Sequence, residues 1–474
     1  MKKTGLWILL CALTVTGLRA QEYAITFRTE GGTDSVLYIG EYYRDALQVR
    51  DSARRNSKGE YRFAGKGVWN HGIYALMRKD AKKSMVDFVI DGDQRFGISG
   101  DKDLTLPSLR VSGSRSNQQM VAYMARLQQA KARHDSLQRA GDTQGLERLN
   151  QEMTLYEKTM FALQNENLFF RLVQRCENPR VPDSVQDKAL YYRMHYWDRL
   201  LDGKPLAWNE IHSPQLFEKM NYYFFGVLYR ADSDTICASI DRLMQRIGHD
   251  TAMVRYVLQH IEPNYYRSSA RIIGWDAVWC HLVERYYLPS HYPWQKESDR
   301  YVMTNNWKRI RQSIIGAHGQ ELWMLDTTQI DKPEHWISSH RFPNRYVILW
   351  FWDPDCHHCQ QYSAELKVLY DSLQAAGDKR LEIYAIGYDS DVEKWKRYVR
   401  EHDFRWPNVG GPQVNVDYQE AYNVHSAPTM IILDERRDII MNKVVTADQL
   451  LRFLDEHEKR QAVKPEQQTA NSKR

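Results

Sequence analysis

The chain has 474 residues, of which 43% are hydrophobic and 26% are charged, and its formal net charge is +5. This composition is typical of a folded, water-soluble protein rather than of a disordered or membrane-embedded one, and at roughly 100 to 200 residues per domain the length predicts about three domains. The basic residues form no block that would track phosphates, so the charge does not indicate nucleic acid as a partner.

The first 20 residues have the pattern of a secretory signal peptide. Lys2 and Lys3 precede an apolar run over residues 6–18, and Ala20 is a small residue at the expected cleavage point. The run is shorter than the roughly 20 residues that cross a bilayer, and no later segment reaches that length. We therefore expect export, and no stable membrane span in the mature chain.

Residues 21–113 carry the signals of short strands joined by turns. Apolar and polar residues alternate over 23–27 and 59–63, and the run 86–90 ends at a turn. We predict an all-β, sandwich-like module. The stretches VRDSARRNSKGEYRFAG and LRVSGSRSNQ resemble the β-rich domain of unknown function that often precedes thioredoxin folds in secreted Gram-negative proteins, a resemblance that implies no chemistry.

Helical spacing of apolar residues begins after Ser114. Residues 114–164 are predicted to be a long helical connector of two amphipathic helices with a break at Gly141. Residues 165–315 remain helical and become rich in aromatic residues, which we interpret as a helical core, with a ligand or peptide groove as the alternative. In domain order this region resembles the helical domain of unknown function that joins such β modules to a thioredoxin fold.

Residues 316–460 alternate between strand and helix patterns. After an opening strand at 319–326, the predicted elements are a buried strand at 346–352, a helix, a strand at 381–386, a helix at 392–401, a hairpin of 429–433 with 439–441, and a helix at 447–457. This order is that of a thioredoxin fold. The polar tail 461–474 is predicted to be disordered. The fold class is therefore multidomain: an N-terminal all-β sandwich-like module, a central α-helical region and a C-terminal α/β thioredoxin fold.

Two cysteines follow the buried strand directly, in the stretch FWDPDCHHCQQ. A Cys-x-x-Cys pair between a strand and a helix places Cys356 at the helix start, where free backbone N–H groups and the helix dipole favour a thiolate, and Cys359 one turn further on. Such sulfurs can act as attacking and resolving thiols in disulfide exchange.

A second motif, VHSAPT, lies about seventy residues later and just before a strand. Together with FW and the cysteine pair it resembles the TlpA/ResA group of extracytoplasmic thiol-disulfide oxidoreductases, in which a cis-proline loop faces the dithiol. The resemblance implies that Pro428 is that proline, that Cys356 is the nucleophile and Cys359 the resolver. It also implies exchange with protein thiols and disulfides of the cell envelope and with a further redox partner, with no cofactor beyond the Cys356–Cys359 disulfide. The expected location is the periplasm or outer envelope of a Gram-negative bacterium.

Several neighbours of the dithiol are expected to modulate its chemistry. His358 takes the place of the histidine that favours the thiolate in strongly oxidising DsbA-like sites, whereas Asp355 opposes it because a nearby carboxylate disfavours a thiolate. The direction of electron flow therefore stays open. The other expected modulators adjoin the two motifs: Trp352, His357, Ala427 and Thr429.

The acid that would exchange a proton with the resolving thiol is not assigned. Trp350 stands where cytosolic thioredoxins carry a buried acid on the strand before the cysteines. Asp389 or Asp391, after the next predicted strand, are candidates for its replacement.

Two other functions remain as alternatives. Four consecutive residues at a helix start diverge and cannot close around one ion, but Cys356, Cys359 and His425 together could hold copper(I) or zinc in a metal chaperone. A non-enzymatic envelope binding protein on an inactive thioredoxin fold is the other alternative. The remaining cysteines are interpreted as buried thiols, with a Cys237–Cys280 bridge as a less favoured possibility: Cys176, Cys237 and Cys280.

Overall fold

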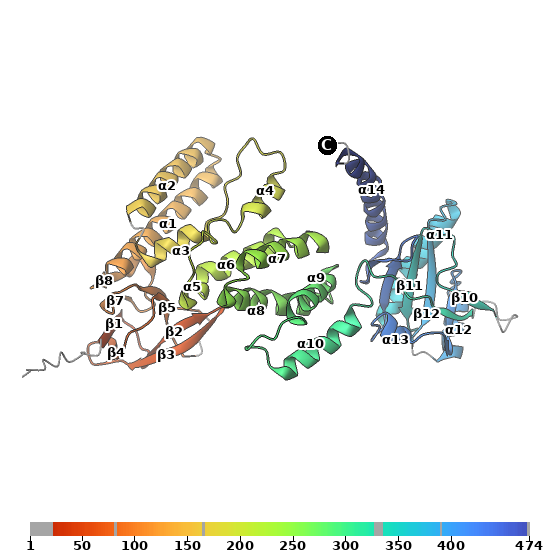
Figure 1. The fold of residues 1–474 in the computed structure, drawn as a ribbon, viewed down its shortest axis with the longest axis horizontal. Helices are drawn as coiled ribbons and strands as arrows, with labels where there is room; N and C mark the ends of the chain where they lie inside the picture. Colours follow the sequence, from red (N-terminus) through yellow and green to blue (C-terminus); the bar gives the residue numbers. More distant parts are fainter. Residues whose placement is uncertain (1–21, 80–82, 164–165, 327–334, 389–390, 472–474) are drawn as a thin grey trace, which may run out of the picture. The chain divides into compact units, whose positions relative to one another are not determined.

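The structure is a computed structural model that describes residues 22–79, 83–163, 166–326, 335–388 and 391–471, so the predicted signal peptide lies outside the described residues. Figure 1 shows the fold of the chain, which divides into two compact units by its internal contacts. The first comprises Met1–Tyr229 and Arg242–Leu258, and the second Arg230–Asp241 and Gln259–Arg474.

The first unit begins with two four-stranded sheets that enclose one hydrophobic core. The first sheet has the order β4 (Glu60–Lys66), β1 (Glu22–Glu30), β7 (Arg95–Asp101) and β8 (Arg110–Ser112). The second has the order β3 (Ala46–Arg54), β2 (Val36–Tyr43), β5 (Gly72–Met77) and β6 (Val86–Ile90). The sandwich-like prediction is confirmed. Sequence analysis located β1, β4 and β6 only. It could not detect β5 because every residue of that strand is buried, which removes the alternation that marks a strand with one solvated face.

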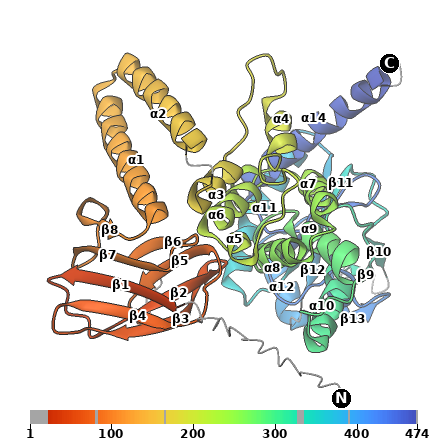
Figure 2. The ribbon, with the colours of Figure 1, turned by 60° about the vertical axis from the view of Figure 1, so that its left-hand side comes forward.

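A helical hairpin follows the sandwich, formed by α1 (Arg115–Ala140) and α2 (Thr143–Leu163) after a short 3₁₀ turn (Leu106–Ser108) (Figure 2). The predicted break is present, since Gly141 adopts a left-handed conformation with φ of 68° and ends α1. Asn117 fastens the hairpin to the sandwich: its Oδ1 accepts the Val89 backbone N–H at 2.7 Å, and its Nδ2 donates to the Val89 carbonyl at 2.7 Å.

The rest of the central region is helical and has an aromatic core, as predicted. Buried rings pack against one another at centroid distances between 4.5 and 5.1 Å in pairs drawn from Tyr196, Trp197, Tyr223 and Phe224. The elements are α3 (Leu168–Cys176), α4 (Lys188–His195), α5 (Trp208–Ile211), α6 (Pro214–Tyr222), a π-helical turn (Tyr223–Val227), α7 (Ser233–Ile247), α8 (Thr251–Ser268), α9 (Trp275–Leu282), a second π-helical turn (Val283–Tyr287) and α10 (Glu297–Ile310).

The second unit contains a seven-stranded mixed sheet. Its order is β10 (Trp336–Ser338), β9 (Trp323–Asp326), β13 (Asn408–Val414), β12 (Leu381–Gly387), β11 (Tyr346–Trp352), β14 (Thr429–Leu433) and β15 (Ile439–Met441). The central strand β11 pairs parallel with β12 and antiparallel with β14. Four helices accompany the sheet: α11 (His357–Ala375), α12 (Val392–Glu401), α13 (Tyr418–Ala421) and α14 (Ala447–Asn471).

Both faces of this sheet are covered, which explains the unbroken apolar sequence of β11. Its alternate residues enter two cores, one shared with α11, α12 and α14 and the other with α13. The predicted strand–helix order and the α/β fold are confirmed. The structure adds β10, β13 and α13, which are short or rich in Gly and Pro and therefore carry weak patterns.

Two features of the second unit differ from the sequence predictions. Residues 461–471, which the sequence analysis placed in a disordered tail, belong to α14, which ends at Asn471. The predicted boundary at residue 316 separates the helical region from the thioredoxin fold, but it does not separate the two compact units, because the second unit already includes residues from Gln259 onward. Gly316 donates its N–H to the Ile439 carbonyl at 2.8 Å, and the buried Asp276 carboxylate of α9 accepts from Lys443 Nζ at 3.3 Å.

Candidate active site

The dithiol lies where β11 passes into α11. A tight turn makes the connection: the Asp355 N–H donates to Asp353 Oδ1 at 2.6 Å, and the Cys356 N–H donates to the Asp353 carbonyl at 3.1 Å. Cys356 is then the N-cap of a 19-residue helix, and its Sγ accepts the Cys359 backbone N–H at 3.3 Å. The sulfur therefore occupies the place where Ser, Thr or Asp usually caps a helix, facing unpaired N–H groups and the positive end of the dipole.

The two sulfurs have different environments. Cys356 is half-buried, whereas Cys359 has no exposed surface. Burial is the main cause that raises the pKa of Cys359 to about 12, and the hydrogen bond with Cys356 adds to it. A partner can reach the first sulfur only, so the geometry suits attack by Cys356 and resolution by Cys359. Both are free thiols in this structure.

The loop before β14 approaches the first sulfur. Since β14 pairs with β11 in a register that opposes Thr429 to Phe351, the preceding residues stand beside the end of β11. The Ala427–Pro428 peptide bond is cis, as the family resemblance implies. The Cys356 thiol donates to the Ala427 carbonyl at 3.7 Å, and the Thr429 hydroxyl donates to the Ser426 carbonyl at 2.7 Å. Residues 71 positions apart thus meet at the dithiol.

The expected modulators are arranged around this centre in different ways. The side chains of His357 and His358 are exposed on the first turn of α11. Trp352 is fully buried against the aromatic rings of α12 and of the segment that follows it. Asp355 forms an ion pair with Lys394 of α12. That ion pair places a positive charge beside the carboxylate, which the sequence analysis did not include.

Comparison with known families supports the thioredoxin-like fold of the domain that carries the dithiol. A family model described as thioredoxin-like matches residues 344–439, which hold both cysteines and Pro428. These residues form a thioredoxin-like domain. A second model, a domain of unknown function (DUF5106), matches residues 136–313, within the predicted helical regions. No curated protein matches the chain in sequence.

Solved structures similar to this chain carry related descriptions. A domain of a possible thiol-disulfide isomerase from Cytophaga hutchinsonii is 28% identical over 32% of this chain and 97% of its own, with a TM-score of 0.28. A thioredoxin-like protein from Bacteroides caccae is 18% identical over 59% of this chain and 98% of its own, with a TM-score of 0.45. A secreted thiol-disulfide isomerase from Corynebacterium glutamicum is 22% identical over 26% of this chain and 77% of its own, with a TM-score of 0.24.

The thioredoxin-like domain does not assemble the alternative metal site. His425 is exposed, and its Nε2 lies 2.9 Å from Asn423 Oδ1 rather than against the cysteines. Within the described part of the chain, no three His, Cys, Asp or Glu side chains are grouped in a way that could hold a metal ion. The set of Cys356, Cys359 and His425 is therefore not brought together.

Of the two predicted acids, only Asp391 lies among the described residues, and its carboxylate caps a helix. Asp389 lies outside the described residues, and the exposed Asp391 caps α12 by accepting the N–H groups of Glu393 and Lys394. Trp350, in the place of the missing acid, donates from Nε1 to the buried Ser363 hydroxyl at 3.0 Å.

Sequence analysis missed Asp353 as part of the site. Its negative charge is one of the causes that raise the pKa of Cys359, while its backbone N–H acts in the opposite direction. The available signal was its position, since it is the first residue after the strand that delivers the cysteines.

The other thiols stand apart from this chemistry. All three are free, so the less favoured Cys237–Cys280 bridge is not formed. Burial raises the pKa of Cys176 and of Cys237 to about 12, and it raises that of Cys280 as well. Cys280 is buried, as the sequence predicts, whereas Cys176 and Cys237 are partly exposed. In the part of the chain that the structure describes, no helix has the length and apolar character needed to span a bilayer.

Proposed function

We propose that this protein is a thiol-disulfide oxidoreductase of the cell envelope, that Cys356 is its nucleophile and that Cys359 is its resolving thiol. The single observation that carries the proposal is the unequal placement of the two sulfurs: the first is accessible and caps a helix, and the second is buried with its pKa raised to about 12. The pattern of the first 20 residues supports export.

In the reducing direction the reaction has two exchanges. The Cys356 thiolate attacks one sulfur of a partner disulfide, that S–S bond breaks, and the other partner sulfur leaves as a thiolate and takes up a proton. Cys359 then loses its proton and attacks Cys356, which releases the second partner thiol and forms the Cys356–Cys359 disulfide. The partner gains two electrons and two protons, and the dithiol loses them. The oxidising direction reverses each step.

The placement of the sulfurs divides these tasks. Helix-end N–H groups stabilise negative charge on Cys356 before attack and when it is the leaving group. The high pKa of Cys359 keeps it protonated in the waiting dithiol, so Cys356 rather than Cys359 supplies the attacking thiolate. Once the mixed disulfide forms, the hydrogen bond to the Cys356 thiolate is lost, and with it one cause of that raised pKa.

The test uses the mature chain from residue 21 in two assays, reduction of insulin and refolding of a scrambled disulfide protein. Cys356→Ser should abolish activity in whichever assay the wild-type protein is active, and Cys237→Ala is the matched control that should retain it. Cys359→Ser should accumulate mixed disulfides with envelope proteins through Cys356. Inactivity of the wild-type protein in both assays, together with an absence of such adducts, would favour a binding protein on an inactive thioredoxin fold.

A further inference from the structure

The α1–α2 hairpin of the first unit has two unlike sides. On one side, Arg126 and Arg133 of α1, seven residues apart, both form ion pairs with Glu152 of α2. The two arginines lie on the same side of their helix because seven residues complete nearly two turns. They therefore join the helices and cover the seam between them on that side.

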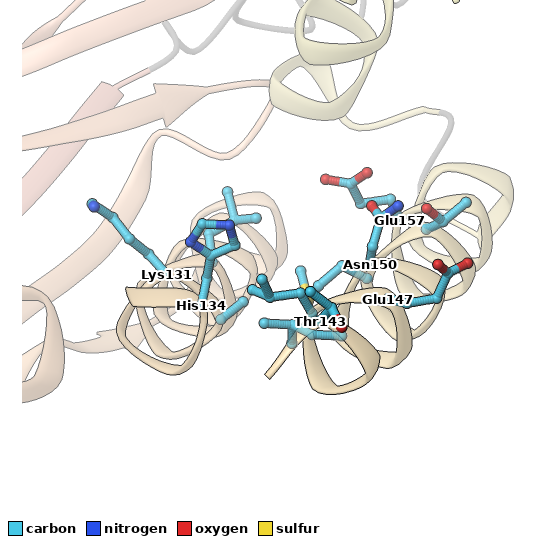
Figure 3. Close-up of a pocket in the computed structure, with 12 residues that line it drawn as sticks. Lys131, His134, Thr143, Glu147, Asn150 and Glu157 are labelled. Carbon is cyan, nitrogen blue, oxygen red and sulfur yellow. The ribbon is translucent and has the colours of Figure 1, made fainter. Parts of the chain in front are cut away.

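The other side of the seam is open. A groove of about 720 Å³ runs between the two helices there (Figure 3). Its apolar lining comes from both helices, at the i, i+3, i+4 and i+7 spacings of one helix face: Leu127, Ala130, Leu146, Leu149 and Met153. Such a stripe is the surface that a helix presents to further helices in a bundle, and here two stripes lie side by side with an open channel between them.

The rims of the groove carry opposite charges. Figure 3 shows Lys131 and His134 on the α1 rim and Glu147 and Glu157 on the α2 rim. Lys131 also pairs with Asp135 of its own helix at 3.1 Å, but its side chain is 77% exposed and remains available. The asymmetry extends beyond the rims, because α1 carries five Lys or Arg and one Asp, whereas α2 carries three Glu and two Lys or Arg.

We propose that this groove binds the same groove of a second copy of the chain, so that two hairpins form a four-helix bundle. A twofold axis parallel to the hairpins places α1 of each copy over α2 of the other. The basic rim then faces the acidic rim in both halves of the contact, and the four apolar stripes become the interior of the bundle. A surface whose two halves are oppositely charged is complementary to itself under such a rotation, which favours a second copy over an unrelated helix.

Charge reversal with mixing tests this arrangement. In one variant the basic rim becomes acidic by Lys131→Glu with His134→Glu, and in a second the acidic rim becomes basic by Glu147→Lys with Glu157→Lys. Each variant alone brings like charges together in both halves of the bundle, and we expect its self-association to weaken about tenfold or more. An equimolar mixture pairs opposite charges in both halves, so the mixture should associate within about threefold of the wild-type affinity.

The measurement is sedimentation velocity of the full mature chain over a range of concentrations and at two salt concentrations, with circular dichroism to verify helix content. Lys58→Glu, an exposed change in the β module, is the matched control and should leave association unchanged. A wild-type chain that is monomeric at its highest soluble concentration would overturn the proposal. A dimer that neither rim reversal weakens would overturn it as well, because the contact would then lie elsewhere. The rescue by mixing cannot arise from misfolding of either variant.

Discussion

Alkylation of the native protein with iodoacetamide at pH 7 should modify Cys356 and leave the other four cysteines of the mature chain unmodified. The thiolate is the reacting species. With its pKa raised to about 12, Cys359 is a thiolate in only about one molecule in 10⁵ at pH 7, whereas a thiol with the ordinary pKa of about 8.5 is roughly 3% ionised. Ionisation alone therefore disfavours Cys359 by about 3,000-fold relative to an ordinary thiol. Its full burial lowers the rate further.

The same penalty applies to Cys176 and Cys237, whose pKa values burial raises to about 12, so these two serve as internal controls. Cys356 differs from these two thiols in lying at a helix N-terminus, and it differs from Cys359 in being partly exposed. The assay is a time course of labelling, quenched and analysed by peptide mass spectrometry, with a sample in guanidinium in which all five thiols should react alike. Labelling of Cys359 at a rate within about tenfold of Cys356 in the native protein would refute the assignment of roles.

Three further predictions concern two buried side chains that affect stability and one ion pair beside the dithiol. Arg437→Met should lower the free energy of unfolding of the thioredoxin-like domain in urea by about 2 to 4 kcal/mol, because the buried Arg437 guanidinium donates to four backbone carbonyls. The control Arg436→Met changes an exposed side chain and should have little effect. Equal effects of the two substitutions would contradict this reasoning. Burial lowers the pKa of His212 to about 4, below its unfolded value of about 6.5, so protonation of His212 favours the unfolded chain. The free energy of unfolding should therefore fall by about 2 to 3 kcal/mol as the pH drops from 6.5 to 4. Hydrogen exchange of the first unit measures that loss, and His212→Phe should remove most of it; an unchanged pH dependence in the variant would exclude the histidine as the cause. Lys394→Ala should leave the Asp355 carboxylate unpaired beside the dithiol and slow the alkylation of Cys356 about threefold, whereas Lys394→Arg should preserve the rate. Faster alkylation in the alanine variant would show that the ion pair hinders the reaction of Cys356 rather than assisting it.

The C-terminal fold and its reactive pair could be predicted from sequence because their signals are local. A continuous apolar run gives β11, and a cysteine pair at the following helix start gives the dithiol, whereas the loop of Pro428 that faces the dithiol came only from the family resemblance. Both local signals depend on residues within one element or its boundary. The β sandwich was recognised as a class for the same reason, although strands with both faces buried left no alternation to detect.

Contacts between distant residues were decided only by tertiary packing. The ion pair between Asp355 and Lys394 joins side chains 39 positions apart, and nothing in either local pattern indicates it. The full burial of Cys359, which separates its role from that of Cys356, results from the core that closes over the first turns of α11. The α1–α2 hairpin makes the same point, since two amphipathic helices were predictable but the covered and open sides of their seam were not. Helical periodicity specifies which residues share a face, while the partner of that face is set by the approach of a second element, which depends on the whole fold.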